Sequence, residues 1–186
     1  MCGGSLGRAL EELEKVVIYT DVDPIPEGVI EAVVVPSREW SIWKLVDAVA
    51  AGRPDAAVSQ LHTLLASGKK ADAAALETVL PQLTRQMRLL WQGRLVLDHG
   101  MAQAAPGFPE KPNFASEPEY RQRAILEKVR GLDPLRISAC FRLLGDADAS
   151  LKGLAPQFSA TETLERTVLL MCAAVRPGRT MAASAP

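Results

Sequence analysis

The feature that most constrains the fold of this chain is a series of apolar residues at helical spacing, interrupted by prolines. Near the amino terminus, apolar residues recur at steps of four, three and four, which places them in one stripe on one face of a helix. This first stripe consists of Leu6, Leu10, Leu13 and Val17. We therefore expect an amphipathic helix from Ser5 onward, with Glu11, Glu12, Glu14 and Lys15 on its solvated side.

Prolines divide the next part of the chain. Pro24 and Pro26 stop the first helix, and Pro26 can then occupy the first turn of a short helix that ends at Pro36. The residues Val33-Val34-Val35 could alternatively form a short strand. Because no partner strand is apparent nearby, a helix is the preferred interpretation.

A pair of antiparallel helices should follow. Ser41 can cap the first of them, Gly52 suits the left-handed position after its end, and Pro54 can open the second, which should close at Gly68. The short connection requires the two helices to run antiparallel. The residues expected to face inward are Ile42, Leu45, Val46, Val49, Val58, Leu61, Leu64 and Leu65.

A longer helix is predicted from about Asp72, kinked or split at Pro81. Its apolar side comprises Leu76, Leu80, Leu83, Met87, Leu90 and Leu97. Residues 103–118 collect prolines and Gly107, a composition that cannot continue a helix and predicts an irregular crossing segment.

The last third predicts three more helices. The first carries Tyr120, Ile125 and Val129, and the second begins with Asp133 as cap and Pro134 at its first position. The second helix should pass through Gly145 to Gly153, and its stripe is Ile137, Cys140, Leu144, Ala147 and Leu151. Ser159 and Glu162 have capping-box spacing before a final stripe of Leu164, Val168, Met171 and Val175. The tail, 176–186, should be disordered.

Composition agrees with an all-α fold and narrows the function. The chain is 48% hydrophobic but only 5% aromatic, and its net charge of −1 leaves no basic excess for a dedicated nucleic-acid binder. Contact with DNA would therefore be local, and Arg85 and Arg88 are the candidates. Three scattered cysteines, Cys2, Cys140 and Cys172, predict a reducing, cytoplasmic location. No apolar run is long enough to span a membrane.

No motif predicts catalysis, and we expect no catalytic residue, cofactor or metal. A phosphate-binding glycine loop is absent. Ser41 and Lys44 have the spacing of a serine nucleophile and a lysine base, but the companion motifs are missing, so a surface cap and a solvated lysine are the better interpretation. His62 and His99 lack the close pairing with each other or with cysteine that zinc requires.

Five segments, in order, resemble the delta subunit of the bacterial DNA polymerase III clamp loader. Leu10-Glu11-Glu12-Leu13-Glu14-Lys15-Val16 is similar to a helix of that family's lid domain, and residues 25–34 resemble the short helix after it. Ile42-Trp43-Lys44-Leu45-Val46-Asp47-Ala48 with Gly52-Arg53-Pro54-Asp55-Ala56-Ala57 resembles the start of the C-terminal domain. The long central helix is matched by Leu83-Thr84-Arg85-Gln86-Met87-Arg88-Leu89-Leu90. The closing helices are matched by Leu143-Leu144-Gly145-Asp146-Ala147-Asp148-Ala149-Ser150-Leu151-Lys152 and Leu164-Glu165-Arg166.

The resemblance implies a division of the chain. A helical lid-domain remnant would cover 1–36, and a helical C-terminal collar domain, which joins subunits of the clamp loader, would cover 37–175. The family's N-terminal domain, with its ATPase-like fold and sliding-clamp contact, has no counterpart ahead of Met1, so the chain is expected to be a fragment, a truncated reading frame or a cut piece. Clamp opening is therefore not carried over.

The leading hypothesis is a subunit-assembly module that supports loading of the sliding clamp onto primed DNA in replication. Its implied partners are the gamma/tau and delta prime subunits of the DNA-directed DNA polymerase (nucleotidyltransferase) holoenzyme. Leu151, Leu164, Val168 and Met171 are the candidate interface residues. The alternative hypotheses are a helical protein–protein adaptor unrelated to replication and, third, a small helical-bundle enzyme.

Overall fold

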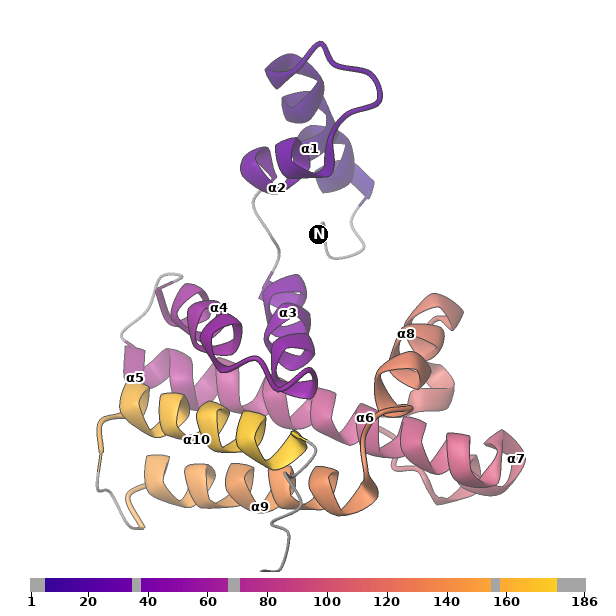
Figure 1. The fold of residues 1–186 in the computed structure, drawn as a ribbon, viewed down its shortest axis with the longest axis vertical. Coiled ribbons are helices and arrows are strands. Elements are labelled where there is room, and N and C mark those ends of the chain that lie inside the picture. The colour runs from indigo at the N-terminus through magenta and orange to yellow at the C-terminus, as the bar shows by residue number, and fades with distance from the viewer. Residues whose placement is uncertain (1–5, 35–37, 67–70, 155–157, 177–186) are drawn as a thin grey trace, which may run out of the picture.

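The structure of this chain is a computed structural model that describes residues 6–34, 38–66, 71–154 and 158–176. Within these ranges every regular element is helical, which confirms the predicted all-α fold (Figure 1). No helix of the described part has both the length and the hydropathy that a membrane span needs. The helices are α1 (Leu6–Tyr19), α2 (Glu27–Val33), α3 (Arg38–Ala50), α4 (Pro54–Ala66), α5 (Ala71–Ala74), α6 (Leu80–His99), α7 (Met101–Ala104), α8 (Glu119–Val129), α9 (Pro134–Leu151) and α10 (Ala160–Val175).

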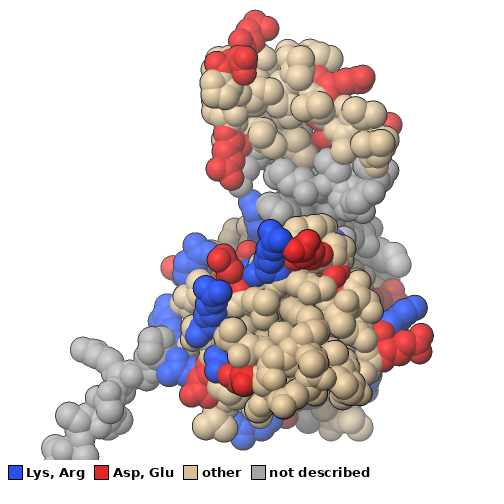
Figure 2. All heavy atoms as spheres, turned by 90° about the vertical axis from the view of Figure 1, so that its right-hand side faces the viewer, with Lys and Arg blue, Asp and Glu red and all other residues tan. Residues whose placement is uncertain are grey.

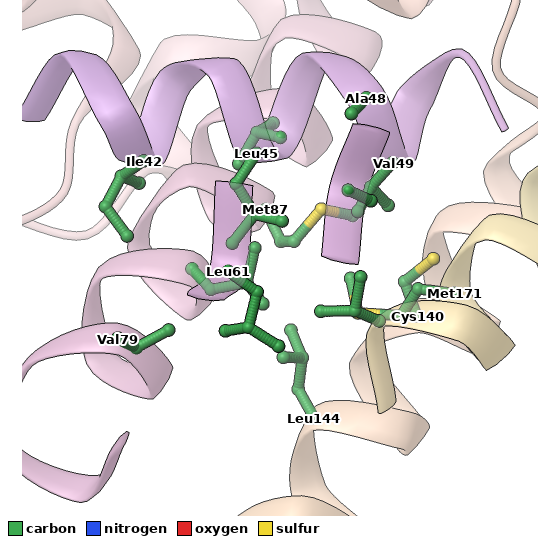
Figure 3. Packing of buried hydrophobic residues seen from close by; sticks show 14 of the residues in the cluster. Ile42, Leu45, Ala48, Val49, Leu61, Val79, Met87, Cys140, Leu144 and Met171 are labelled. Atoms are coloured by element: carbon green, nitrogen blue, oxygen red, sulfur yellow. The ribbon is translucent and has the colours of Figure 1, made fainter. Parts of the chain in front are cut away.

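Helices α3 to α10 form the body of the molecule. The 20-residue helix α6 contacts α3, α8 and α9, while α10 contacts α9, α3 and α4. Figure 3 shows side chains from α3, α4, α6, α9 and α10 meeting in one cluster, among them Leu45, Met87, Cys140 and Met171. Burial of this apolar surface is the main stabilising contribution to the body.

Most of the stripes predicted for the body are buried. Ile42, Leu61, Leu83 and Ile137 are each no more than 1% exposed. Leu97, which was expected on the apolar side of the long helix, is 40% exposed, so that assignment is wrong. It lies in the last turns of α6, where the helix extends beyond the cluster (Figure 1).

The local signals for helix ends are confirmed in most places. Gly52 has a φ of +62°, and Pro54 is the first residue of α4. The Asp133 side chain accepts a hydrogen bond from the Leu135 N–H, and α9 begins at Pro134 as predicted. Ser159 and Glu162 form the predicted capping box. These caps satisfy N–H groups that a helix start leaves without an intrahelical partner.

The structure refines three other expectations about the helices. Helix α3 begins at Arg38, so Ser41 lies inside the helix and is 7% exposed, and its prediction as a surface cap is wrong. The predicted interruption at Pro81 takes the form of a π-helical turn, Ala75–Val79, directly before α6. Helix α9 passes through Gly145 and ends at Leu151, and Gly153 follows with a φ of +83°.

Helices α1 and α2 pack against each other and are called here the N-terminal pair. Figure 1 shows them at one end of the molecule, beyond α3 and α4. Val16 and Val34 are buried, but neither belongs to the cluster of the body. Helix α2 continues to Val33, while Val35 lies outside the described residues, as do Gly68 and 177–186 of the predicted tail.

The pattern of burial in α1 differs from the expectation. Glu12, predicted on the solvated side, is 7% exposed and pairs with the Lys15 ammonium at 2.7 Å, so that prediction is wrong for Glu12. All four residues of the stripe at Leu6, Leu10, Leu13 and Val17 are at least 53% exposed. Within α1, the apolar stripe is therefore the exposed side.

Candidate interaction surfaces

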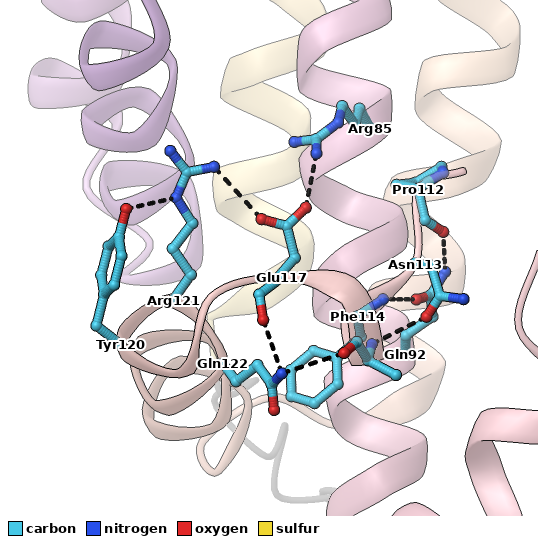
Figure 4. Close-up of polar contacts among 10 residues, drawn as sticks. Arg85, Gln92, Pro112, Asn113, Phe114, Glu117, Tyr120, Arg121 and Gln122 are labelled. Atoms are coloured by element: carbon cyan, nitrogen blue, oxygen red, sulfur yellow. Dashed lines mark hydrogen bonds and ion pairs between the residues drawn. The ribbon is translucent and has the colours of Figure 1, made fainter. Parts of the chain in front are cut away.

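The segment predicted to be irregular, 103–118, is held against α6 by a buried glutamine. It contains the end of α7 and two short 3₁₀ turns, Ala105–Gly107 and Phe114–Ser116. Gln92 donates a hydrogen bond to the Pro112 carbonyl at 2.8 Å and accepts one from the Phe114 N–H at 2.6 Å (Figure 4). The Phe114 side chain is fully buried. A single side chain thus satisfies two backbone groups in the interior.

A second anchor of this segment involves Arg85, one of the two residues predicted to contact DNA. Arg85 Nη2 donates to Glu117 Oε1 at 2.6 Å, and Arg121 Nη1 donates to the other carboxylate oxygen at 3.3 Å (Figure 4). The Glu117 side chain is only 8% exposed, whereas the Arg85 and Arg121 side chains are 37% and 22% exposed, so it is the carboxylate that is poorly hydrated. Arg85 is therefore already engaged within the chain.

Arg88, the other DNA candidate, is exposed on α6 and has no ion pair among the described residues. It lines the same groove as Arg85, with a volume of about 500 Å³. Asp148, which pairs with Lys152 at 2.7 Å, lies in the opposite wall. The groove, called the arginine groove, is lined by Leu80, Pro81, Thr84, Arg85, Arg88, Pro112, Phe141, Leu144, Gly145 and Asp148. A carboxylate beside the arginines weakens the case for phosphate binding there.

The residues predicted to form a subunit interface lie mostly in the core of the chain. Leu164, Val168 and Met171 are 0% exposed, and Leu151 is half-buried against the same cluster. Val168, a candidate interface residue, is thus covered within the chain itself. The physical reason is that α10 packs along both α9 and α4, which covers its most regular stripe. These four side chains therefore pack within the body of the chain.

Those neighbours form an exposed apolar area on α10. Leu169 and Leu170 are 45% and 41% exposed, and Phe158, just before the helix, is 45% exposed. Two adjoining hollows share Phe158, Arg166 and Leu170 in their walls. One of them, called the α9–α10 groove, has a volume of about 360 Å³ and is lined by Leu143, Asp146, Ala147, Ala149, Ser150, Phe158, Thr163, Arg166, Thr167 and Leu170.

A further group of exposed apolar side chains lies on the N-terminal pair. Ile18 and Tyr19, at the end of α1, and Val22, beyond the helix, add to this exposed apolar surface, with 85%, 67% and 57% exposure. Monomeric proteins rarely expose contiguous apolar patches of more than a few hundred Å² unless the patch is a contact surface. We call the set Leu6, Leu10, Leu13 and Val17 the α1 stripe.

Charge is distributed unevenly along the chain. Residues 6–34 contain seven acidic and two basic residues, for a formal charge of −5. Because the whole chain carries −1 and residues 1–5 carry none, residues 35–186 carry +4. Figure 2 shows acidic side chains around the N-terminal pair and most of the visible basic side chains on the body. A partner of the N-terminal pair should therefore present an apolar and basic surface.

Of the residues considered for catalysis or metal binding, Ser41 and Lys44 lie three positions apart in α3, and Cys2 lies outside the described residues. His62 Nε2 lies 2.5 Å from Glu165 Oε1, which joins α4 to α10. Burial raises the pKa of the Cys140 thiol to about 11, with a smaller contribution from nearby Cys172, so Cys140 stays protonated at neutral pH. Among the described residues, no group of three metal-ligating side chains is found.

The described residues form a helical module with exposed apolar surfaces, and its fold is similar to that of a solved structure. The structure of the Bacillus subtilis DNA clamp loader delta protein (YqeN) matches 91% of this chain with a TM-score of 0.64 and 16% sequence identity. This chain covers 47% of that protein, so it spans about half its length. No family model and no curated protein matches the sequence. At this identity the comparison establishes a clamp-loader-like fold.

Proposed function

We propose that this chain is the subunit-assembly module of a clamp-loader delta subunit. The observation that carries the proposal is the structural match to a clamp-loader delta protein over 91% of the chain. The order of the five sequence segments that resemble the same family supports it independently. In this role the chain holds neighbouring subunits in a cytoplasmic assembly, and its contribution to loading the sliding clamp on primed DNA is made by packing.

We also propose a division of labour along the chain. The N-terminal pair corresponds to the lid-type unit over 1–36, and the body corresponds to the collar domain over 37–175. The separate buried residues of the pair, Val16 and Val34, support this division because they contribute nothing to the cluster of the body. The α1 stripe then serves as a contact surface of the lid-type unit within the assembly.

Reconstitution tests the proposed role. The full chain is mixed with purified gamma/tau and delta prime subunits from the same genome and analysed by size-exclusion chromatography with light scattering. We expect co-elution at the mass of a defined complex. A chain that elutes alone from every mixture would contradict the clamp-loader role and leave the helical adaptor as the better hypothesis.

The contribution of the α1 stripe is tested with the double variant Leu10→Asp, Leu13→Asp. Because both side chains are more than half exposed, the variant should retain its helical circular dichroism while losing part of its affinity for the complex. Glu14→Ala, on the exposed part of the same helix, is the matched control and should bind as the unmodified chain does. Equal affinity of the two variants would remove the stripe from the proposal.

Contact of Arg85 and Arg88 with DNA stays a prediction, and the structure favours Arg88 over Arg85. The exposed Arg88 is the better candidate because Glu117 already binds Arg85. In the reconstituted complex, Arg88→Ala should reduce affinity for primed DNA and its salt dependence, as expected for loss of one phosphate contact. Arg123→Ala, an exposed arginine paired with Glu119 on α8, is the control. An unchanged salt dependence in Arg88→Ala would exclude the contact.

A further inference from the structure

The α9–α10 groove has the form of a binding site for a helix. It lies between two helices that pack side by side along the lower face of the body in Figure 1. Its apolar wall residues Leu143 and Leu170 come from different helices and leave space between them. Side chains on one ridge of a helix fit such a space between two others.

One buried polar atom in this groove has no partner. Thr163 is 6% exposed, lines the groove, and its Oγ1 makes no hydrogen bond in the described structure. The neighbouring Thr167, which is equally buried, donates to the Thr163 carbonyl at 2.7 Å. A buried hydroxyl without a partner is costly, and most such groups in proteins are satisfied. The Thr163 hydroxyl is therefore placed to bond to a polar group of a molecule in the groove.

The charges around the groove specify the occupant further. Glu162 is used in the capping box of α10, and Glu165 faces His62. The Arg166 guanidinium lies 5.3 Å from the centre of the Phe158 ring and forms no ion pair with any described residue. An exposed arginine over an aromatic ring, free of internal carboxylates, is a typical anchor for an acidic residue of a partner.

The opposite wall carries a charge of the other sign. Asp146 of α9 is exposed and has no ion pair among the described residues. The groove thus presents a cation on α10 and an anion on α9, with apolar side chains between them. An amphipathic helix with an apolar ridge, a carboxylate on one flank and a basic side chain on the other is complementary to this pattern.

From these observations we infer that the α9–α10 groove docks an amphipathic helix of a neighbouring clamp-loader subunit. Apolar side chains of that helix lie between Leu143 and Leu170, its carboxylate binds Arg166, and a polar group bonds to Thr163 Oγ1. This assignment rests on the proposed function, because it identifies the partner as another subunit of the same assembly. In this assignment the contact residues on α10 are Arg166 and Leu170, which are accessible, and not the buried Val168 and Met171.

The test measures affinity of the full chain for purified gamma/tau and delta prime subunits, separately and together, by biolayer interferometry. Leu170→Glu and Arg166→Glu should each weaken binding at least tenfold, since each removes a central contact and adds a repulsive charge. Arg166→Lys keeps the charge and should retain more of the affinity. Leu135→Glu is the matched control, because Leu135 is an exposed leucine of α9 that does not line the groove.

Thr163→Val separates a binding role from a purely structural one. It keeps the shape of the side chain and removes the unpartnered hydroxyl, so the free chain should be equally or more stable toward thermal unfolding. If the hydroxyl bonds to the partner helix, the same variant should bind several-fold more weakly. Thr163→Ser retains the hydroxyl and should bind more tightly than Thr163→Val.

The outcomes distinguish the two levels of the proposal. Binding that is lost in the Leu170 and Arg166 variants and kept in Leu135→Glu supports the groove. Binding that is equal in all variants overturns the groove while the proposed function stands. No binding of the unmodified chain to either subunit overturns both. Circular dichroism of each variant shows whether a loss of affinity reflects unfolding. If Leu170→Glu or Arg166→Glu is unfolded, the affinities of the folded variants Arg166→Lys and Thr163→Val decide whether the groove binds the partner.

Discussion

The N-terminal pair and the body use the same kind of amphipathic helix but place its apolar stripe differently. In the body, the stripes of α4, α6, α9 and α10 meet in one cluster, with Leu61, Leu83 and Leu164 fully buried. In the N-terminal pair, α1 leaves its stripe exposed and buries Val16 and Glu12. The difference is in the number of neighbours, because α10 contacts several helices of the body whereas α1 packs against α2.

This comparison teaches that a stripe identifies a face of a helix but not what covers it. The α1 stripe and the α10 stripe have the same kind of spacing in sequence. Burial of the α10 stripe stabilises the chain itself, whereas exposure of the α1 stripe leaves apolar surface available to another molecule.

The largest expected difference is between leucine truncations in the two regions. Leu83→Ala should lower the free energy of unfolding by about 2–5 kcal/mol, because it removes a fully buried side chain and leaves a cavity. Leu13→Ala, at a position 54% exposed, should change it by less than about 0.5 kcal/mol. Urea unfolding followed by circular dichroism measures both. Equal losses would mean that the α1 stripe is covered in the isolated chain, and the comparison would break.

The buried glutamine gives the next largest effect. Gln92→Met keeps most of the side-chain volume but leaves the Pro112 carbonyl and the Phe114 N–H without their partner, at about 1–3 kcal/mol for each buried group. Gln82→Met, at an exposed position of the same helix, is the control and should be close to neutral. Native-state hydrogen exchange should show faster exchange at Phe114. Unchanged exchange there would mean that the segment is held mainly by its apolar contacts.

Two glycines in helices of the body differ in the space available for a side chain. A Cβ on Gly93 would lie 2.5 Å from Cγ2 of Ile125, whereas one on Gly145 would meet nothing within 4 Å. Gly93→Ala should therefore cost about 1–3 kcal/mol through overpacking. Gly145→Ala should stabilise the chain by roughly 0.5–1 kcal/mol through helix propensity. Thermal unfolding measures whether each variant is less or more stable than the unmodified chain. A stabilising Gly93→Ala would contradict the close packing of α6 on α8.

The smallest predicted effect concerns pH. Hydrogen bonds from the Ser159 side chain and backbone lower the pKa of Glu162 below its usual 4.5. Because the folded pKa is depressed, this contribution to stability is present above pH 4.5 and is lost as pH falls through the folded value. The stability difference between the unmodified chain and Glu162→Gln should thus shrink on acidification. Glu14→Gln in α1, where the described structure gives Glu14 no hydrogen bond, should show a smaller change.

Several parts of the fold were predictable because their causes are local. The caps at Asp133 and Ser159 depend on side chains within three residues of the groups they satisfy. The end of α3 at Gly52 follows from a backbone conformation that favours glycine. The buried stripes of the body follow from a period of 3.6 residues in a chain rich in helix formers.

The candidate interaction surfaces were less predictable, because their features depend on residues that are distant in the sequence. Gln92 resembles any polar residue of a helix in the sequence, and its role arises from a segment 20 and 22 positions away. Arg85 was expected to contact DNA, but it pairs with Glu117, 32 residues further along. A glutamine within an otherwise apolar helical face is the signal that could have indicated Gln92. No comparable signal marks Thr163, because its isolation depends on how α9 and α10 pack.

Local sequence dictates that this chain folds into amphipathic helices, where most of them begin and end, and which residues share a face. These properties depend on backbone hydrogen bonds and side chains within one or two turns. Only the tertiary structure decided which faces are covered, because burial depends on the neighbours that each helix acquires. For α10 it covered the predicted stripe and left Leu169 and Leu170 exposed, whereas for α1 it left the stripe itself exposed.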